Sequence, residues 1–405
     1  MMILRRLAVA LLLILIPACG GDRTAAELPS ATVRDSSGIR IVDNHWSDTP
    51  VPGWSLGPEP DLVIGRLSGD PVYEFTRVSG ASRLSDGRVA VMDGAVSELR
   101  IYGPDGVHVR TFGRKGNGPE EFAAPSLAGR LPGDTLLVFD TDRRWLALVH
   151  PEGGFGRSFI LGREAGDFVS QLGLLGDDAM AFGGGMFFSS EEGFPEGRTR
   201  PNSTYGTVRL DGSPGMSLGR IPAAEMWGRA VEGGFTALRL PFGKLTVAAA
   251  GPDRFFLGTN ESWEIQAFDA EGSLVSRIRT DRAPEEVTEA LRQAYIDVRL
   301  ADADDEADRT AIRARYRDIP FGETLPHYEF LRADATGHLW VRDAALPGED
   351  AARYAVFDPA GRLLGTMSLP PRIFPLEIGE DYLLGRTEDE LGVQTIVLYA
   401  LSRGD

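Results

Sequence analysis

Six short apolar segments, each ending in an acidic or glycine residue, recur along the chain and constrain its fold more than any other feature. They begin at residues 87, 134, 178, 253, 337 and 380. Three of the five spacings lie between 43 and 47 residues, which suits a repeat built from four short strands. The other two are longer by about 30 and 40 residues, so they indicate insertions.

A second strand and a tight turn accompany most of these segments. Asp105-Gly106, for example, separates two runs of alternating apolar and polar residues within residues 97–113. The form repeats at 144–159, 205–220, 263–279 and 353–369. Glycine supplies the positive φ of a tight hairpin, and the alternation is typical of half-buried strands. The repeat is therefore an antiparallel meander, and we expect an all-β fold.

The sixth repeat lacks its last strand, because the chain ends after the strand in residues 394–405. The missing piece is found near the other end, where residues 64–66 match residues 112–114 of an earlier repeat. We therefore predict that residues 61–65 form the fourth strand of the last repeat. A ring closed in this way leaves no open sheet edge.

The segment from Gly113 to Phe122 reads GRKGNGPEEF and follows a strand–turn–strand unit. It resembles the NHL repeat and the six-bladed β-propeller lipoproteins related to it. The resemblance is sharpest over residues 61–160 and covers nearly the whole chain after the leader. It implies a six-bladed β-propeller of four-stranded antiparallel blades, which we place at residues 38–405. The repeat pattern assigns no role to residues 38–44, for which an extra outer strand is one interpretation.

Residues 1–18 read MMILRRLAVALLLILIPA and are followed by Cys19. Two arginines precede an apolar run of ten residues, whereas a bilayer span needs about 20. The pattern is typical of a cleaved export signal. The segment Ile16-Pro17-Ala18-Cys19 resembles the lipobox of bacterial lipoproteins, although proline is unusual at its position. An uncleaved anchor and a plain secretory signal are the alternatives.

Cys19 is the only cysteine of the chain, which argues against a disulfide framework and favours lipidation at this residue. The polar residues 19–37 are predicted to form a flexible tether. Gly20 rather than aspartate follows the cysteine. By resemblance to enterobacterial sorting, this indicates an outer-membrane lipoprotein, held to the membrane by its lipid alone.

The formal net charge is −17, and removal of the leader arginines would leave −19. A surface this acidic repels nucleic acid and anionic lipid headgroups, so we exclude both as partners. We interpret the acidic charge itself as a contribution to solubility.

No set of residues indicates catalysis, a cofactor or a metal. The glycines of 113–118 are followed by Pro-Glu-Glu-Phe instead of the Gly-Lys-Ser/Thr of a phosphate loop, so we interpret them as a crossover between blades. The acidic run 302–308 has Ala307 and Arg313 where a calcium loop needs glycine and glutamate, so we interpret it as a solvated helical turn. The five histidines show no ligand spacing.

The insertions fall at residues 185–204, 221–243 and 281–326. Counting strands places all three on one face of the disc, over neighbouring blades. The last is predicted to be helical, with its first turn at Pro284 to Glu286. An apolar stripe at helical spacing would follow, consisting of Val287, Leu291, Ala294 and Val298.

Aromatic and arginine side chains are frequent in these insertions. Packing onto the disc explains most of the aromatics, but arginines in so acidic a chain favour a pocket for an acidic group. The residues predicted to bind ligand are Phe187, Phe188, Arg200, Trp227, Arg229 and Arg239. We therefore expect a non-enzymatic binding or scaffold module for a protein, peptide or glycan in the cell envelope. The alternative is a lactonase-, lyase- or glycosidase-type propeller enzyme with a divalent metal in its central channel.

Overall fold

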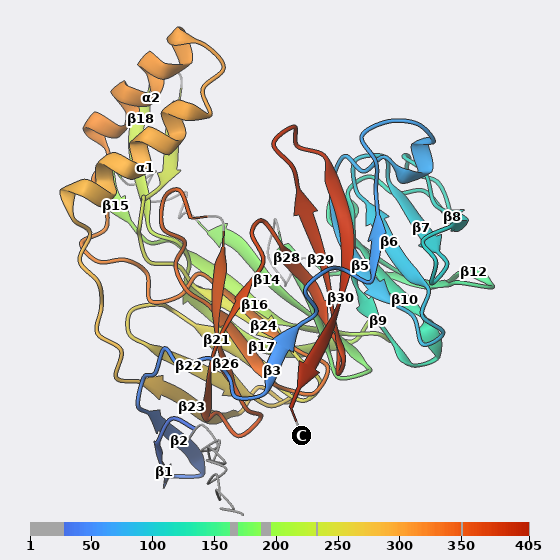
Figure 1. Cartoon of the computed structure of the whole chain (residues 1–405), viewed down its shortest axis with the longest axis horizontal. Helices are drawn as coiled ribbons and strands as arrows, with labels where there is room; N and C mark the ends of the chain where they lie inside the picture. The colour runs from blue at the N-terminus through green and yellow to red at the C-terminus, as the bar shows by residue number, and fades with distance from the viewer. Residues whose placement is uncertain (1–27, 163–168, 188–195, 232–233, 350, 405) are drawn as a thin grey trace, which may run out of the picture.

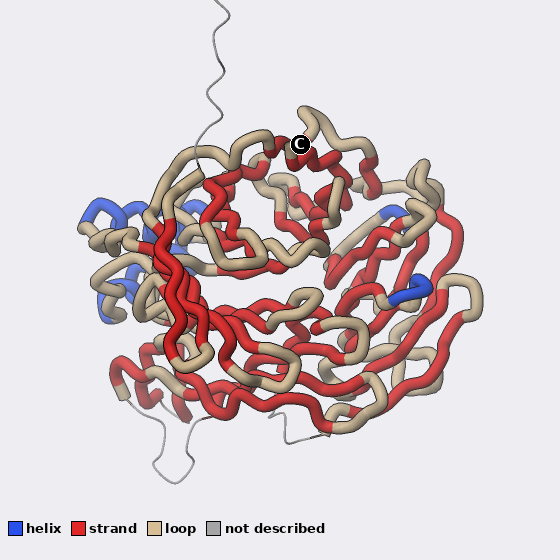
Figure 2. Tube along the Cα trace, turned by 90° about the horizontal axis from the view of Figure 1, so that it is seen from below, coloured by secondary structure: helices blue, strands red, loops and turns tan. Residues whose placement is uncertain are grey.

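The computed structural model describes residues 28–162, 169–187, 196–231, 234–349 and 351–404. Its architecture is almost entirely β (Figure 1). The strands form the body of the molecule, and the two long helices lie at one edge of it (Figure 2).

Six sheets contain most of the strands, and each sheet begins with a strand that lies innermost. Three of them are simple four-stranded antiparallel meanders. The first is β5 (Val78–Arg83), β6 (Val89–Asp93), β7 (Glu98–Tyr102) and β8 (His108–Phe112). The second is β9 (Pro125–Arg130), β10 (Leu136–Asp140), β11 (Trp145–His150) and β12 (Gly154–Ile160). The fifth is β24 (Phe330–Ala333), β25 (Leu339–Arg342), β26 (Ala352–Phe357) and β27 (Leu363–Leu369).

The third sheet is also four-stranded but is interrupted by an insertion between its second and third strands, and the fourth sheet has two additional outer strands. The third is β13 (Val169–Leu175), β14 (Ala179–Phe187), β16 (Asn202–Arg209) and β17 (Pro214–Pro222). The fourth is β20 (Val247–Ala250), β21 (Phe255–Gly258), β22 (Glu264–Phe268) and β23 (Leu274–Thr280). Outside β23 lie β2 (Ile39–Asn44), which pairs with it in parallel, and then β1 (Ala31–Ser36).

The hairpin of β1 and β2 shows how the N-terminal region joins the ring. Residues 39–44, to which the repeat pattern assigned no role, form an outer strand of the fourth sheet. The folded part nevertheless begins earlier than the predicted boundary at residue 38, because β1 lies inside the segment that we expected to be tether. Ser37 and Gly38 have φ of 56° and 82°, the left-handed geometry of a tight hairpin turn.

The sixth sheet joins the two ends of the chain. It contains β28 (Phe374–Ile378), β29 (Tyr382–Glu388) and β30 (Gln394–Arg403). The long strand β30 pairs on its outer side with β4 (Leu62–Ile64) and with β3 (Trp54–Leu56). The predicted closing strand at residues 61–65 is therefore confirmed, and β3 adds a second pairing that the repeat pattern did not predict.

Hydrophobic cores lie between adjacent sheets. Ile64 of β4, for example, is 1% exposed and packs in one cluster with Val91 of the first sheet and Leu384 of the sixth. The innermost strands also contact each other from sheet to sheet. Between the fifth and sixth sheets, Arg332 donates a hydrogen bond to the carbonyl of Leu376 at 3.0 Å, and the rings of Phe330 and Phe374 lie 5.0 Å apart. The sheets thus form a ring around a common axis.

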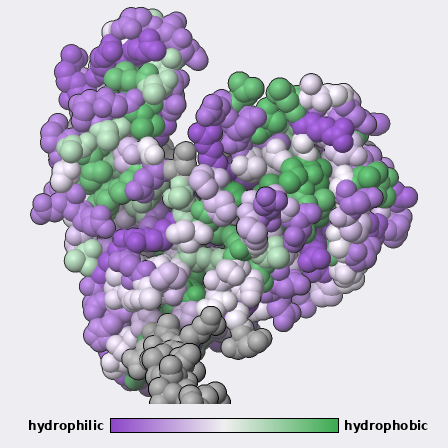
Figure 3. All heavy atoms as spheres, viewed as in Figure 1, coloured by the Kyte–Doolittle hydropathy of each residue, from purple (hydrophilic) through white to green (hydrophobic). Residues whose placement is uncertain are grey.

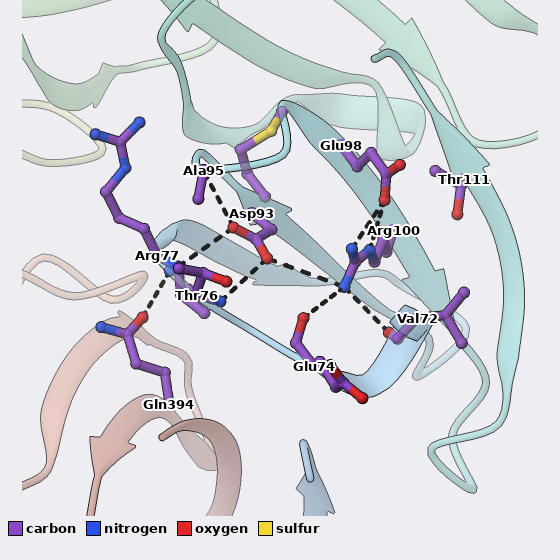
Figure 4. A network of polar contacts seen from close by, with 12 residues as sticks. Val72, Glu74, Thr76, Arg77, Asp93, Ala95, Glu98, Arg100, Thr111 and Gln394 are labelled. Atoms are coloured by element: carbon purple, nitrogen blue, oxygen red, sulfur yellow. Dashed lines mark hydrogen bonds and ion pairs between the residues drawn. The ribbon is translucent and has the colours of Figure 1, made fainter. Parts of the chain in front are cut away.

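Buried polar side chains fix the segments that lead into the inner strands. The carboxylate of Asp93, at the end of β6, accepts hydrogen bonds from the backbone N–H groups of Thr76, Arg77 and Ala95 (Figure 4). Its neighbour Arg100 donates to the carbonyl of Glu74 at 3.1 Å. Asp140 does the same in the second sheet by accepting from the N–H groups of Ala123 and Ala124.

The crossover at residues 113–122 is structural, as expected. The ring of Phe122 is fully buried, and it lies so close to Gly113 that a Cβ there would be 2.6 Å from it. Gly113 also has a φ of 79°, so glycine is required at this position for both space and conformation. Arg114 and Glu121 form an ion pair of 2.9 Å across the loop, and Glu121 accepts from the N–H of Gly118.

Candidate ligand-binding site

The three insertions form one lobe, which we call the cap (Figure 1). It contains the sheet β15 (Gly197–Thr199), β18 (Met226–Val231) and β19 (Gly234–Arg239), and the helices α1 (Glu289–Ala301) and α2 (Glu306–Asp318). Strand β15 of the first insertion pairs with β18 of the second. Gly322 of the third donates a backbone hydrogen bond of 2.9 Å to Pro241 at the end of the second. The insertions therefore support each other directly.

The helical insertion begins later than predicted. Thr288 caps α1 by accepting from the N–H of Leu291, and Asp305 caps α2 by accepting from the N–H of Asp308. The predicted first turn at Pro284 to Glu286 is wrong, because this segment is extended and Glu286 forms an antiparallel bridge with Thr324. The acidic run at 302–308 forms the connection between α1 and α2 and the first residues of α2, as expected of a solvated helical turn.

Aromatic rings, more than the predicted apolar stripe, hold the helices to the cap. Tyr295 of α1 contacts Tyr316 of α2, with ring centroids 5.5 Å apart, and also contacts Phe321 and Phe242. Of the predicted stripe, Val287 is buried but precedes the helix, and Val298 is 37% exposed. The cluster ties the helical hairpin to the segment that follows β19.

A cavity of about 550 Å³, the cap cavity, lies between β19, the two helices and the loop after β25. This volume is within the range of small-molecule sites. Apolar and aromatic side chains line much of it, including Leu238, Pro241, Phe242, Tyr295, Val298 and Tyr316. Over the lobe as a whole, hydrophobic patches lie among mainly hydrophilic side chains (Figure 3).

The charge of the cap cavity is opposite to that of the chain. Arg239, Arg299 and Arg315 line it, and Glu329 is the only acidic residue among its lining residues. Within the part of the chain that the structure describes, Arg239 and Arg315 make neither an ion pair nor a hydrogen bond. The guanidinium of Arg299 lies 5.2 Å from the ring centroid of Tyr295. A side-chain hydrogen bond with Tyr295 raises the pKa of Arg299, and burial acts in the opposite direction. The cavity thus offers unpaired cationic donors beside apolar surface.

The residues predicted to bind ligand do not converge. Directly opposed residues of an antiparallel pair share a face, so Arg239, opposite Met226, lies on the other face of the hairpin from Trp227 and Arg229. Only Arg239 lines the cap cavity. Arg200 is used in the fold, because it pairs with Glu261 at 2.7 Å and donates to the carbonyls of Ala223 and Thr259.

Three of the predicted residues cannot be placed in this geometry. Phe188 and Cys19 lie outside the described residues, and of Phe187 only the backbone, at the end of β14, is described. Conversely, sequence reasoning missed Arg299, Arg315, Tyr295 and Tyr316. The signal available for them was their helical context: Tyr295 and Arg299 are four residues apart, the spacing of neighbours on one face of a helix.

Two further searches concern the whole described structure. Among the described residues, no group of three or more His, Cys, Asp or Glu side chains is placed to hold a metal ion. No helix in the same ranges is both long and apolar enough to cross a membrane.

Comparisons with known proteins identify the fold but no family. No protein-family model matches the sequence, and no curated protein matches it. Among solved structures, a member of the duf4221 family from Bacteroides vulgatus has a TM-score of 0.50 at 9% identity, over 86% of this chain and 98% of that one. A protein from Bacteroides fragilis described as exported has a TM-score of 0.45 at 11% identity, over 89% and 98%. A gluconolactonase from Xanthomonas campestris has 0.37 at 14%, over 86% and 98%.

Similarity at this level of identity shows the fold alone. The ring of sheets, closed by strands from the N-terminal and C-terminal parts of the chain, defines the chain as an all-β protein of the β-propeller class. The predicted class, an all-β propeller built from four-stranded antiparallel sheets, is thereby confirmed. The particular feature of this propeller is the cap, which adds a cationic cavity to one side of an acidic ring.

Proposed function

We propose that this protein is an envelope-anchored binding module, whose cap cavity holds an acidic group of a protein, peptide or glycan ligand. The observation that carries the proposal is the lining of that cavity, with three arginines against one glutamate in a chain of net charge −17. The apolar and tyrosine surface beside the arginines would contact the uncharged part of the ligand.

Arginine suits this role on chemical grounds. Its planar guanidinium binds a carboxylate through two parallel hydrogen bonds, and it stays charged at every physiological pH. Arg239, Arg299 and Arg315 are exposed, so a ligand can reach them without unfolding any part of the cap. The acidic surroundings repel anions elsewhere on the surface and thereby favour binding at this one cationic cavity.

Anchoring at the envelope is the second part of the proposal. The leader, the lipobox-like residues 16–19 and the single cysteine support lipidation of Cys19. Gly20 supports placement at the outer membrane. The polar residues before β1 would then separate the lipid from the propeller.

The test uses the mature protein and two panels of probes. One consists of short peptides with a free or an amidated C-terminus, and the other of oligomers of uronic acids or of the matching neutral sugars. We expect saturable binding of acidic members by calorimetry, weakened about tenfold or more in the double variant R239Q/R315Q. The matched control is R229Q, which removes an exposed arginine from the opposite face of the same hairpin.

Two outcomes would contradict the proposal. One is equal binding of acidic and neutral probes, and the other is equal weakening by R229Q and R239Q/R315Q. Preference for peptides or for sugars decides which class of ligand the cavity takes.

A further inference from the structure

A second cavity, of about 500 Å³, lies beside the stem of the helical hairpin, where residues 285–287 pair with residues 323–325. We call it the stem cavity. Its other walls are the loop after β25 and the first residues of β26. The residues that line both this cavity and the cap cavity are Pro326, Ala344, Ala345 and Leu346. The two cavities are therefore neighbours that share a wall.

Glu329 holds this shared wall in place. One oxygen of its carboxylate, Oε2, accepts a hydrogen bond of 3.1 Å from the backbone N–H of Ala345. The other oxygen, Oε1, lies 3.3 Å from Nε of Arg342, a residue that lines the stem cavity. The acidic residue of the cap cavity is thus paired with an arginine of the neighbouring cavity. It therefore repels an anion in the cap cavity less than a free carboxylate would.

Asp343 fixes two arginines at the stem cavity. Its carboxylate accepts from Nη1 of Arg282 at 2.7 Å and from Nε of Arg353 at 2.6 Å. The guanidinium of Arg282 also lies 4.4 Å from the ring centroid of Trp46, and Arg353 pairs with Asp48 at 2.9 Å. A guanidinium has five N–H donors, so both arginines keep donors that these bonds do not use. The side chain of Arg353 is 39% exposed, so a ligand can reach it.

The stem cavity differs from the cap cavity in its balance of charge. Three arginines line it, and its acidic lining residues are Glu285, Asp343 and Glu349. Burial lowers the pKa of His327, and the charges of Lys244 and Arg282 act in the same direction, so this imidazole is neutral at physiological pH. The lining thus offers several donors and acceptors of hydrogen bonds but no net charge, which suits an uncharged polar group.

Sugar hydroxyls match this lining well. A hydroxyl donates and accepts at one oxygen, so it can bridge a guanidinium and a carboxylate that lie side by side. None of the described residues that line the stem cavity is phenylalanine, tyrosine or tryptophan, and the apolar ones are alanine, leucine and proline. A large apolar side chain of a peptide would therefore find few partners here, whereas a sugar ring would find many.

We propose that the stem cavity is a second subsite, which takes an uncharged sugar unit of an acidic oligosaccharide whose carboxylate lies in the cap cavity. This inference rests on the function proposed for the cap and names its ligand as a glycan that joins a uronic acid to neutral sugars. The glycan would cross the wall at Ala344 to Leu346. A ligand that fills both subsites binds more tightly than the acid alone, because it loses its translational and rotational freedom only once.

Calorimetry of the mature protein tests the proposal, with glucuronic acid and with its conjugates to one or two xylose or glucose units as probes. We expect Kd to fall about tenfold or more from the acid to the best conjugate. S368W should remove this gain, because Ser368 is exposed at the stem cavity and an indole there fills the cavity without breaking an ion pair. R353Q, which removes donors from the same cavity, should reduce the gain as well. The matched control is S158W, which adds the same ring at an exposed position of the outer strand β12 and should keep the gain.

Equal affinity for glucuronic acid and for all its conjugates would overturn this proposal and leave that of the cap standing. A gain that S368W and S158W both retain would overturn it too. If acidic peptides gain affinity with length and lose the gain in S368W, while the conjugates show none, the assignment to a glycan is wrong. Failure of the cap proposal has a different signature. Glucuronic acid itself would then bind equally to the unmodified protein and to R239Q/R315Q, and the second subsite would fall with it.

Discussion

The carboxylate of Asp334 and the guanidinium of Arg403 form an ion pair of 2.9 Å that joins the fifth sheet to the end of the last strand. Asp334 also accepts from the indole N–H of Trp340 at 3.0 Å, and Arg403 lies 4.6 Å from the ring centroid of Trp54 in β3. One buried carboxylate therefore connects the fifth sheet, the last strand of the chain and an N-terminal strand.

This ion pair predicts a specific loss of stability in acid. Burial alone would raise the pKa of Asp334, but hydrogen bonds from His338 and Trp340 and the charge of Arg403 lower it to about 2. A carboxyl whose pKa is lower in the folded state stabilises the fold above its unfolded pKa of about 3.9, and this contribution is lost as pH falls through the folded value. We expect a loss of about 2 kcal/mol between pH 4 and 2 from this group.

The measurement is the free energy of unfolding by denaturant across that pH range. D334N should flatten the corresponding part of the curve. D178N, which removes a carboxylate 70% exposed, should leave it unchanged. A wild-type slope that persists in D334N would contradict the assignment.

Closure of the ring by β4 predicts a contrast between two adjacent residues. Ile64 is 1% exposed and Val63 is 55% exposed, although both pair with β30. I64A should therefore lower the free energy of unfolding by about 2–5 kcal/mol. V63A should change it by about 0.5 kcal/mol or less. Similar losses in the two variants would show that β4 does not contribute to the core.

The network around Asp93 predicts a second large effect (Figure 4). D93A leaves three backbone N–H groups without their acceptor and leaves the buried Arg100, 4.0 Å away, without this partner. We expect a loss of about 3 kcal/mol in thermal or denaturant unfolding. D105A, which alters an exposed turn of the same sheet, should cost about 1 kcal/mol or less.

The helical hairpin of the cap should be removable without loss of the ring. Its two ends meet in a short antiparallel stem, where Val287 donates to Glu323 at 2.9 Å and Leu325 donates to Glu285 at 2.8 Å. Replacement of residues 288–322 by a short glycine-serine turn should lower Tm only slightly, since the stem remains. It should abolish binding of acidic probes in the cap cavity, as calorimetry would show.

The proposed lipidation of Cys19 predicts where the protein is found in cells. C19S should move the protein from the membrane pellet to the soluble fraction and abolish labelling by palmitate. Labelling that survives the substitution would rule out this anchor.

The ring of sheets could be predicted from the local sequence, because each repeat contains its own turn residues and its own alternation of apolar and polar positions. The closing strand was predictable since residues 64–66 repeat a motif found within the first blade. The parallel pairing of β2 with β23 was not, because it joins residues more than 200 positions apart and leaves no local pattern. The first helical turn was placed too early because pairing with Thr324 holds Glu286 extended.

The site was predicted less well than the fold. Which face of the hairpin a residue between 226 and 239 occupies depends on the position of the turn. In the observed register, Arg239 and Arg229 lie on opposite faces. Arg299 and Arg315 look like exposed helical charges in the sequence. Only the packing of α1 and α2 against the segment after β19 brings them to a cavity.

Closure by both chain ends also sets an order of events during synthesis. The strands β3 and β4 are made early, yet their partner β30 begins only at Gln394. Neither strand can pair before the ribosome has translated more than 300 further residues. A chain truncated anywhere before this last strand retains a sheet edge and an exposed Ile64, features that quality-control proteases and chaperones recognise as unfinished.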